Sequence, residues 1–286
     1  MNSALKLVIE APVAAKLGMI IVLLNVLAAV FAPVIAPYSE TEIIGDTWEG
    51  GFWDSEAPEH DPPALLGTDH IGRDLFTRLI YGARNTIGIA LVTTMLAFAV
   101  GISLGFLAAT LRGSVDQIIS RSVEVLMAIP TLIFALMVLL VLGTEVHILI
   151  VVIALLDATR VFRISRAVAM DVEVMEYVEV AKLRGEGLWW VMRHEILPNT
   201  MAPLLAEFGL RFCFVFLFIA ALSFLGLGLQ PPTADWGSMV RENAEGINWG
   251  IIVPLFPAGA IALLTVGVNL IVDWFLHKAS GIRDIE

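Results

Sequence analysis

The chain has 286 residues, of which 58% are hydrophobic and 16% are charged, and its net charge is −11. A composition this apolar excludes an ordinary water-soluble domain and predicts a protein embedded in a membrane. The negative charge argues against nucleic acid as a partner. The single cysteine, Cys213, excludes an internal disulfide, and its place within an apolar run predicts a small core residue.

Six stretches are apolar and long enough to cross a bilayer as helices, which requires about 20 residues each. They cover 17–36, 86–110, 125–143, 147–165, 207–229 and 249–276. The alternative for the first stretch is a secretory signal peptide. Its length and the lack of a small-x-small cleavage site favour a retained anchor.

The positions of Lys and Arg predict the orientation. With six spans and both termini in the cytoplasm, twelve of the 17 basic residues fall on the inside, as the positive-inside rule requires. The chain then divides into a cytoplasmic N-terminus (1–16), a first transmembrane helix (17–37), an acidic extracytoplasmic loop (38–85), a five-helix transmembrane core (86–276) and a cytoplasmic C-terminus (277–286).

The extracytoplasmic loop 38–85 holds ten acidic residues and three arginines. One interpretation is a solvated, partly ordered loop. The other is a docking surface for an extracytoplasmic protein or a cationic solute. The sequence leaves both open.

A polar loop on the inner side, 166–203, is organised as two short helices. Apolar residues recur at helical spacing on either side of Gly185: Val174, Val178 and Ala181 before it, and Leu188, Val191, Met192 and Ile196 after it. Gly185 predicts a sharp turn between the two helices, because glycine adopts such turns without a Cβ penalty. Periodicity alone does not decide whether the apolar face meets lipid or a protein.

Ionisable residues near the spans predict local ion pairs. Asp157 precedes Arg160 by three positions, and Glu207 precedes Arg211 by four, so each pair shares a helix face. Asp273 is placed to pair with His277 or Lys278. None of these has the pattern of a proton relay.

Three residues are candidates for lining a pathway through the membrane. Pro130 interrupts the third span and predicts a kink there, close to Met127. Phe224, near the end of the fifth span, is the third candidate. Gly101 and Gly105 form a G-x-x-x-G pattern, which indicates either close helix packing or an ordinary glycine-rich membrane helix.

The inner loop also carries a spaced signature: Glu179, Ala181, Gly185 and then Ile196, Leu197 and Pro198. This spacing resembles the cytoplasmic signature of the permeases of binding-protein-dependent ABC importers, with departures at Val180 and Glu195. Further blocks resemble the dipeptide/oligopeptide/nickel permeases: 66–69, 72–74, 78–84, 176–179, 225–232 and 236–237. The long acidic loop resembles that of the C-type permease of two-permease complexes.

The resemblance implies an all-α type I ABC importer permease fold with six transmembrane helices and a cytoplasmic coupling-helix loop. In that role Glu179, Ala181 and Gly185 seat and bend the coupling element, while Leu188, Val191 and Met192 contact an ATPase or the membrane. The expected partners are a second related permease, two ATPase subunits and an extracytoplasmic solute-binding protein. The expected location is a prokaryotic cytoplasmic (inner) membrane.

No G-x-x-x-x-G-K-[ST] motif occurs, so ATP and Mg are expected on partner subunits. No cofactor, metal site or catalytic residue is expected on this chain, because its histidines do not cluster. The implied function is ATP-driven import of short peptides. Alternatives are a nickel chelate, glutathione or an opine as cargo and, from another class, a self-sufficient secondary transporter or channel. An intramembrane hydrolase is disfavoured, because Asp157 has no second catalytic group.

Overall fold

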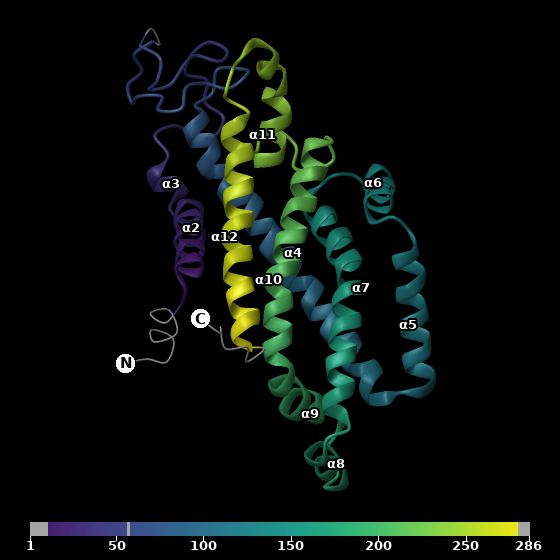
Figure 1. Cartoon of the computed structure of the whole chain (residues 1–286). Coiled ribbons are helices and arrows are strands. Elements are labelled where there is room, and N and C mark those ends of the chain that lie inside the picture. Colours follow the sequence, from purple (N-terminus) through teal and green to yellow (C-terminus); the bar gives the residue numbers. More distant parts are fainter. Residues whose placement is uncertain (1–10, 56–57, 280–286) are drawn as a thin grey trace.

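The computed structural model describes residues 11–55 and 58–279, and its regular elements in these ranges are helices (Figure 1). The long helices are α2 (Val13–Val30), α4 (Leu75–Leu111), α7 (Val146–Glu173), α10 (Leu197–Phe224) and α12 (Leu255–Ala279). The shorter ones are α3 (Ala32–Ile35), α5 (Gly113–Ala128), α6 (Thr131–Leu142), α8 (Glu176–Leu183), α9 (Leu188–Val191), a π-helix (Met192–Ile196), α11 (Trp236–Asn243) and a 3₁₀ helix (Ala244–Trp249). The predicted all-α class is confirmed.

Four of the described helical segments are long and apolar enough to cross a membrane: α2, α4, Leu188–Phe224 and Leu255–Lys278. The pair α5 and α6 supplies a fifth if it is counted as one broken span. α7 is long enough to cross a membrane, with 28 residues. It is not among these four because three charged residues, Asp157, Arg160 and Arg163, make it less apolar. The number of six spans therefore stays a prediction.

The second long helix begins earlier than its hydropathy indicates. α4 starts at Leu75 instead of residue 86, because the Asp74 carboxylate accepts a hydrogen bond of 2.7 Å from the backbone amide of Thr77 and caps the helix. The charged residues Arg78 and Arg84 lie inside this extension. The acidic outer segment therefore ends at Asp74 rather than at residue 85.

The third predicted span, 125–143, is not one straight helix. α5 and α6 meet at Ile129 and Pro130 at an angle of 89°. Proline lacks the amide hydrogen that would continue the hydrogen-bond ladder of α5, so the helix ends and a new one starts in another direction. The predicted kink is present. However, the helix before the kink, α5, consists mostly of the amphipathic residues 113–124, which precede the predicted span.

Among the described helices, α4 and α7 make the most extensive contact. Ser165 of α7 donates a hydrogen bond of 3.0 Å to the carbonyl oxygen of Gly101. A Cβ atom added at Gly105 would lie 2.2 Å from Ser165 Oγ and 2.9 Å from the backbone nitrogen of Arg166. The two glycines thus allow backbone contact between the helices, which supports the close-packing interpretation of the G-x-x-x-G pattern. We call this contact the α4–α7 seam.

Helix α2 packs on α12 in a similar way. A Cβ added at Gly18 would lie 2.6 Å from the carbonyl oxygen of Gly267. A helix that fits another this closely belongs to the bundle, which supports a retained anchor over a signal peptide. α2 begins and α12 ends on the side of the molecule where α8 and α9 lie (Figure 1).

The acidic segment 38–74 folds into a defined structure, which we call the outer cap. It contains only isolated bridges, such as Ile43 with Arg73, yet it is fixed to the segment after α10 by long-range contacts. The indole nitrogen of Trp48 and the backbone amide of His70 donate hydrogen bonds of 3.1 and 2.9 Å to the side-chain oxygen of Asn243. Trp53 stacks on Phe256 with ring centroids 5.5 Å apart. The described residues of this segment therefore form a defined structure that is joined to α11 and α12.

A network of buried charges lies under the outer cap. The Arg73 and Arg78 guanidinium groups contact the Asp69 carboxylate at 2.7 and 3.3 Å and the Glu242 carboxylate at 3.2 and 3.3 Å. Arg78 is only 1% exposed. Because two carboxylates balance two guanidinium groups, the buried charges are paired, which is the condition under which they are tolerated.

Gly105→Ala tests the α4–α7 seam, with Gly88→Ala as its control. Alanine at position 105 meets backbone atoms of α7, whereas nothing lies within 4 Å of a Cβ at position 88 on the same helix. We expect Gly105→Ala to cost about 1–3 kcal/mol of stability through overpacking, seen as a lower midpoint of thermal unfolding in detergent. Gly88→Ala should leave the midpoint unchanged or raise it slightly, because alanine favours helix. Equal shifts in the two variants would contradict the seam.

Candidate coupling surface and translocation face

The two helices of the inner loop meet at Gly185, as the sequence predicts. Gly185 has φ +84°, a left-handed conformation that favours glycine. Its amide donates to the carbonyl of Lys182 at 2.9 Å, and the amide of Glu186 donates to that of Ala181 at 3.2 Å. This pair of bonds is a Schellman motif, which satisfies the last carbonyls of α8 and reverses the chain.

The apolar face of this loop packs against the protein's own helices. The buried members are Val178, Ala181, Val191, Met192 and Ile196, which form one cluster with Phe106, Ala109, Ala169 and Leu204. These last four belong to α4, α7 and α10, so the loop is seated on the ends of three long helices. Val191 and Met192, which were expected to contact an ATPase or the membrane, pack inward in this cluster, with exposed fractions of 2% and 6%. Spacing identified their shared face but could not show what covers it.

A second apolar surface at the tip of the loop is exposed. Val180 of α8 is 51% exposed and Leu183 81%. Across the turn, Leu188 is partly exposed and Trp189 projects outward with 68% exposure. Glu179 is also exposed on α8. Helix α8 therefore has apolar residues on both sides, one set buried in the protein and one available to a partner.

Ion pairs fasten this loop to the bundle. The buried Glu173 carboxylate, at the end of α7, pairs with Arg112 at the end of α4 and with Lys182 of α8. We call these three residues the Glu173 latch. A second contact joins α7 to α5, where the Arg166 guanidinium donates two hydrogen bonds of 2.5 Å to Asp116. Such bidentate pairs fix geometry as well as charge.

A groove of about 660 Å³ runs between α5 and α7. Its lining mixes charged and apolar side chains: Ser120, Val123, Glu124, Met127, Ala128, Phe162, Arg163 and Arg166. Among the three candidates for pathway lining, only Met127 lies in this groove. Pro130 lies at the break between α5 and α6, and Phe224 ends α10 with 47% of its surface exposed.

A charge cluster lies beside this groove, between α7 and α10. Both predicted pairs are present: Arg160 contacts Asp157 at 3.6 Å, and Arg211 contacts Glu207 at 2.7 Å. The structure adds a contact of 3.5 Å between Arg211 and Asp157, which joins the two pairs across helices. No local sequence pattern signals this third contact, because its partners are far apart in the chain.

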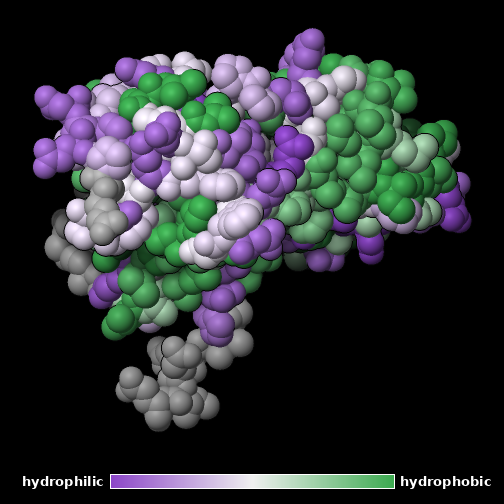
Figure 2. Space-filling view, turned by 90° about the horizontal axis from the view of Figure 1, so that it is seen from above, coloured by the Kyte–Doolittle hydropathy of each residue, from purple (hydrophilic) through white to green (hydrophobic). Residues whose placement is uncertain are grey.

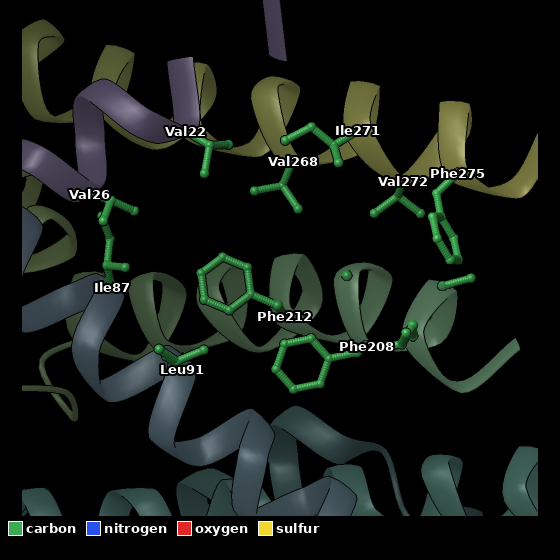
Figure 3. A pocket seen from close by; sticks show the side chains of 13 residues that line it. Val22, Val26, Ile87, Leu91, Phe208, Phe212, Val268, Ile271, Val272 and Phe275 are labelled. Carbon is green, nitrogen blue, oxygen red and sulfur yellow. The ribbon is translucent and has the colours of Figure 1, made fainter. Parts of the chain in front are cut away.

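A second hollow is lined by apolar side chains. It measures about 440 Å³ and lies between α2, α4, α10 and α12, with side chains such as Val22, Leu91, Phe212 and Val268 pointing into it (Figure 3). It lacks the polar groups that a hydrophilic solute needs when it leaves water. We therefore exclude it as a route for polar cargo.

One group of residues has ligand types that suit a metal. Single ligand atoms of Asp69, His70 and Glu242 lie within 4.8 Å of one another. The carboxylates of Asp69 and Glu242 are already paired with Arg73 and Arg78. Two guanidinium groups in contact with these oxygens repel a cation, so the group is better explained as the charge network of the outer cap.

These features together define a membrane permease subunit: a helical bundle with a charged groove, an ordered cap at one end and a helical docking loop at the other. Residues 101–278, more than half of the chain, match the family described as the binding-protein-dependent transport system inner membrane component. Residues 13–58 match the N-terminal transmembrane domain of oligopeptide transport permease C. The chain belongs to the binding-protein-dependent transport system inner membrane component family.

Several relatives are similar to this chain over most of their length. A di/tripeptide transport system permease protein of Pseudomonas aeruginosa is 35% identical over 274 residues, covering 93% of this chain and 85% of the relative. A dipeptide transport system permease protein of Haemophilus influenzae is 33% identical, covering 94% and 88%. A glutathione transport system permease protein of Pectobacterium atrosepticum is 29% identical, covering 92% and 83%.

Among solved structures, the crystal structure of an amino acid ABC transporter with histidines has a similar fold. The TM-score is 0.50, the sequence identity is 19%, and the match covers 71% of this chain and 94% of that chain. At this identity the likeness concerns the fold alone. It agrees with the predicted type I permease fold.

Glu173→Gln tests the latch, with Glu176→Gln at the exposed start of α8 as the control. Removing the buried charge leaves Arg112 and Lys182 without their shared partner. We expect amide hydrogen exchange in α8 to become about tenfold faster, the effect of losing about 1.4 kcal/mol of local stability. Exchange in α12, far from the latch, should not change. Equal acceleration in Glu176→Gln, or none in Glu173→Gln, would contradict a fastening role for Glu173.

Proposed function

We propose that this chain forms part of the translocation pathway for short peptides in an ABC importer, powered by ATP hydrolysis in partner subunits. The observation that carries the coupling role is the exposed apolar tip of α8 and α9, held in position by the Gly185 turn and the Glu173 latch. An exposed apolar surface on helices that are held in a fixed position is suited to binding a protein partner. Among the residues that the sequence predicts for coupling to an ATPase, Glu179 and Leu188 have side chains that can reach such a partner.

The proposed partners occupy different faces of the molecule. Two ATPase subunits, which bind ATP and Mg, receive the tip of α8 and its counterpart on a second, related permease. An extracytoplasmic solute-binding protein docks over the outer cap. Seen from above, hydrophilic residues gather over the outer cap, whereas hydrophobic ones dominate the opposite side of the molecule (Figure 2). On α6, Met137, Leu140 and Val141 are 62–83% exposed, and they suit contact with the second permease or with lipid.

The proposed location is a prokaryotic cytoplasmic membrane, with both termini and α8 in the cytoplasm. In the proposed cycle, closure of the ATPase subunits displaces α8. The permease pair then opens outward, and the docked binding protein releases its cargo into the pathway. Hydrolysis returns the pair to the inward-facing state. No residue of this chain takes part in bond chemistry.

Peptides are the cargo we favour, because the relatives at 33–35% identity are named for di- and tripeptide transport. Glutathione, itself a small peptide, is the second candidate, since a glutathione permease is 29% identical over most of the chain. Nickel chelates and opines have no comparable support. A self-sufficient secondary transporter is disfavoured by the family and by the pairing of the intramembrane acids Asp157 and Glu207 with arginines.

The test is uptake by proteoliposomes that contain this chain, its second permease, the ATPase subunits and the binding protein. We expect uptake of a labelled dipeptide only when ATP and binding protein are both present. Isolation of the chain from membranes without any nucleotide-binding subunit, together with uptake that needs no ATP, would contradict the proposal.

The same uptake assay tests the role of the Gly185 turn. It compares Gly185→Leu with Gly187→Leu, a control two residues away. A Cβ atom added at either position would have no other atom within 4 Å, but only position 185 has a positive φ. A left-handed non-glycine residue costs about 1–2 kcal/mol, so Gly185→Leu should shift α8 and reduce coupled uptake about tenfold. Gly187→Leu should retain uptake. Unchanged uptake and binding-protein-stimulated ATPase activity in Gly185→Leu would contradict a coupling role for the turn.

A further inference from the structure

The charge cluster between α7 and α10 consists of two acids and two bases: Asp157, Arg160, Glu207 and Arg211. All four lie well inside helices of 28 residues each. Placing charges in a membrane-spanning helix is costly, and such residues are retained mainly where they act. Their contacts of 2.7–3.6 Å balance the charges, so the cluster has no net charge.

The cluster has unused hydrogen-bonding capacity. The Asp157 side chain is only 3% exposed, yet neither of its carboxylate oxygens accepts a hydrogen bond from the described residues. Arg160 NH1, Arg211 Nε and Glu207 Oε1 are also without a hydrogen-bond partner there. In a purely structural ion pair, hydrogen bonds to the charged groups offset the free-energy cost of removing them from water. In this cluster the charges are paired at 2.7–3.6 Å, but the paired atoms approach one another without hydrogen-bond geometry.

The basic members of the cluster are partly exposed. The side chains of Arg160 and Arg211 are 28% and 21% exposed. Both guanidinium groups lie over the ring of Phe214, at 4.4 and 5.3 Å from its centroid, and this ring is 39% exposed. Arg160 also donates a hydrogen bond of 3.1 Å to the hydroxyl of Thr131, next to the break between α5 and α6.

The cluster and the groove between α5 and α7 share helix α7. Arg163, which lines that groove, lies one helical turn from Arg160. At the cluster, positive and negative groups stand side by side, with both guanidinium groups over the Phe214 ring.

We propose that this cluster is a binding station for the free termini of a short peptide in transit. Arg160 and Arg211 bind the peptide's carboxylate, and Asp157 and Glu207 bind its α-ammonium group. The assignment rests on the proposed function, because it requires this face to line the peptide pathway. Since the termini are common to all short peptides, the station accepts many side chains, which contact Phe214.

Weak binding follows from the same geometry. A peptide's charged ends replace contacts that the cluster already makes within itself, so only part of their interaction energy is gained. A site in a transport pathway must release its cargo as readily as it binds it. A cluster that closes on itself when empty meets this requirement and also leaves no unpaired charge in the membrane.

The test places a photoreactive group at the station without removing any charge. Phe214 is replaced by p-benzoylphenylalanine in the purified complex of both permeases and the ATPase subunits, and labelled dialanine is the probe. Leu263, 57% exposed on α12, carries the same group in the control. The binding protein is omitted, so its own preference for free termini does not enter. Both nucleotide-free and vanadate-trapped complexes are irradiated.

We expect labelling at position 214 and little at position 263. Excess unlabelled dialanine should suppress it, whereas dialanine acetylated and amidated at its ends should not. Adding Arg160→Gln and Arg211→Gln should weaken labelling about tenfold, the effect of losing a charged hydrogen bond, while Arg121→Gln on the exposed face of α5 should not. Equal labelling at 263, or equal competition by the blocked peptide, would overturn the station.

The outcome is separable from that of the proposed function. If the wild-type complex shows ATP-dependent dipeptide uptake but position 214 is not labelled in either nucleotide state, the station is refuted and the importer role stands. If ATP-dependent uptake is absent, the proposed function fails, and with it the basis for the station.

Discussion

The structure depends on the backbone contact between α4 and α7. Gly101 and Gly105 remove the side chains that would separate these helices, and Ser165 adds a hydrogen bond across the contact. In a bilayer, helices gain little from hydrophobic burial against each other, so close packing and interhelical hydrogen bonds are the main sources of association. The outer cap at one end of the molecule and the α8–α9 loop at the other are both joined to the two helices of this seam.

The two ends are connected through it. At one end, α4 begins under the outer cap, where Arg78 joins Asp69 to Glu242. At the other end, Arg112, the residue after α4, and Glu173, the last residue of α7, form the latch that holds α8. We therefore expect a displacement of α8 to act on two long helices whose close packing opposes sliding, and to reach the cap as a movement of one body. The break at Pro130 turns α6 away from α5, and each of these helices is joined to α7 by one polar contact, Arg166 with Asp116 for α5 and Arg160 with Thr131 for α6.

The sequence predicts those features that depend on neighbours along the chain. The Gly185 turn needs only a glycine after a helix, and the pairs of Asp157 with Arg160 and Glu207 with Arg211 follow from helical spacing. Features that depend on distant partners were missed. Hydropathy placed the start of α4 too late, because charged Arg78 near that start is neutralised by Asp69 and Glu242, the latter more than 150 positions away. The burial of Val191 and Met192 could not be foreseen, because an apolar face does not reveal whether it meets lipid, a partner or its own bundle.

The most direct test of this account is a distance measured between the two ends of the chain during the cycle. Spin labels at Ile71→Cys in the outer cap and Leu183→Cys at the tip of α8, both exposed positions, are introduced with Cys213→Ala in the complete transporter. If the seam transmits motion as a rigid unit, their separation should differ by less than about 2 Å, the scale of helix shifts within packed interfaces, between nucleotide-free and ATP-bound states. The distance from Leu183 to the equivalent position on the second permease should change by more. A change within the chain as large as the change between the two permeases would contradict the account.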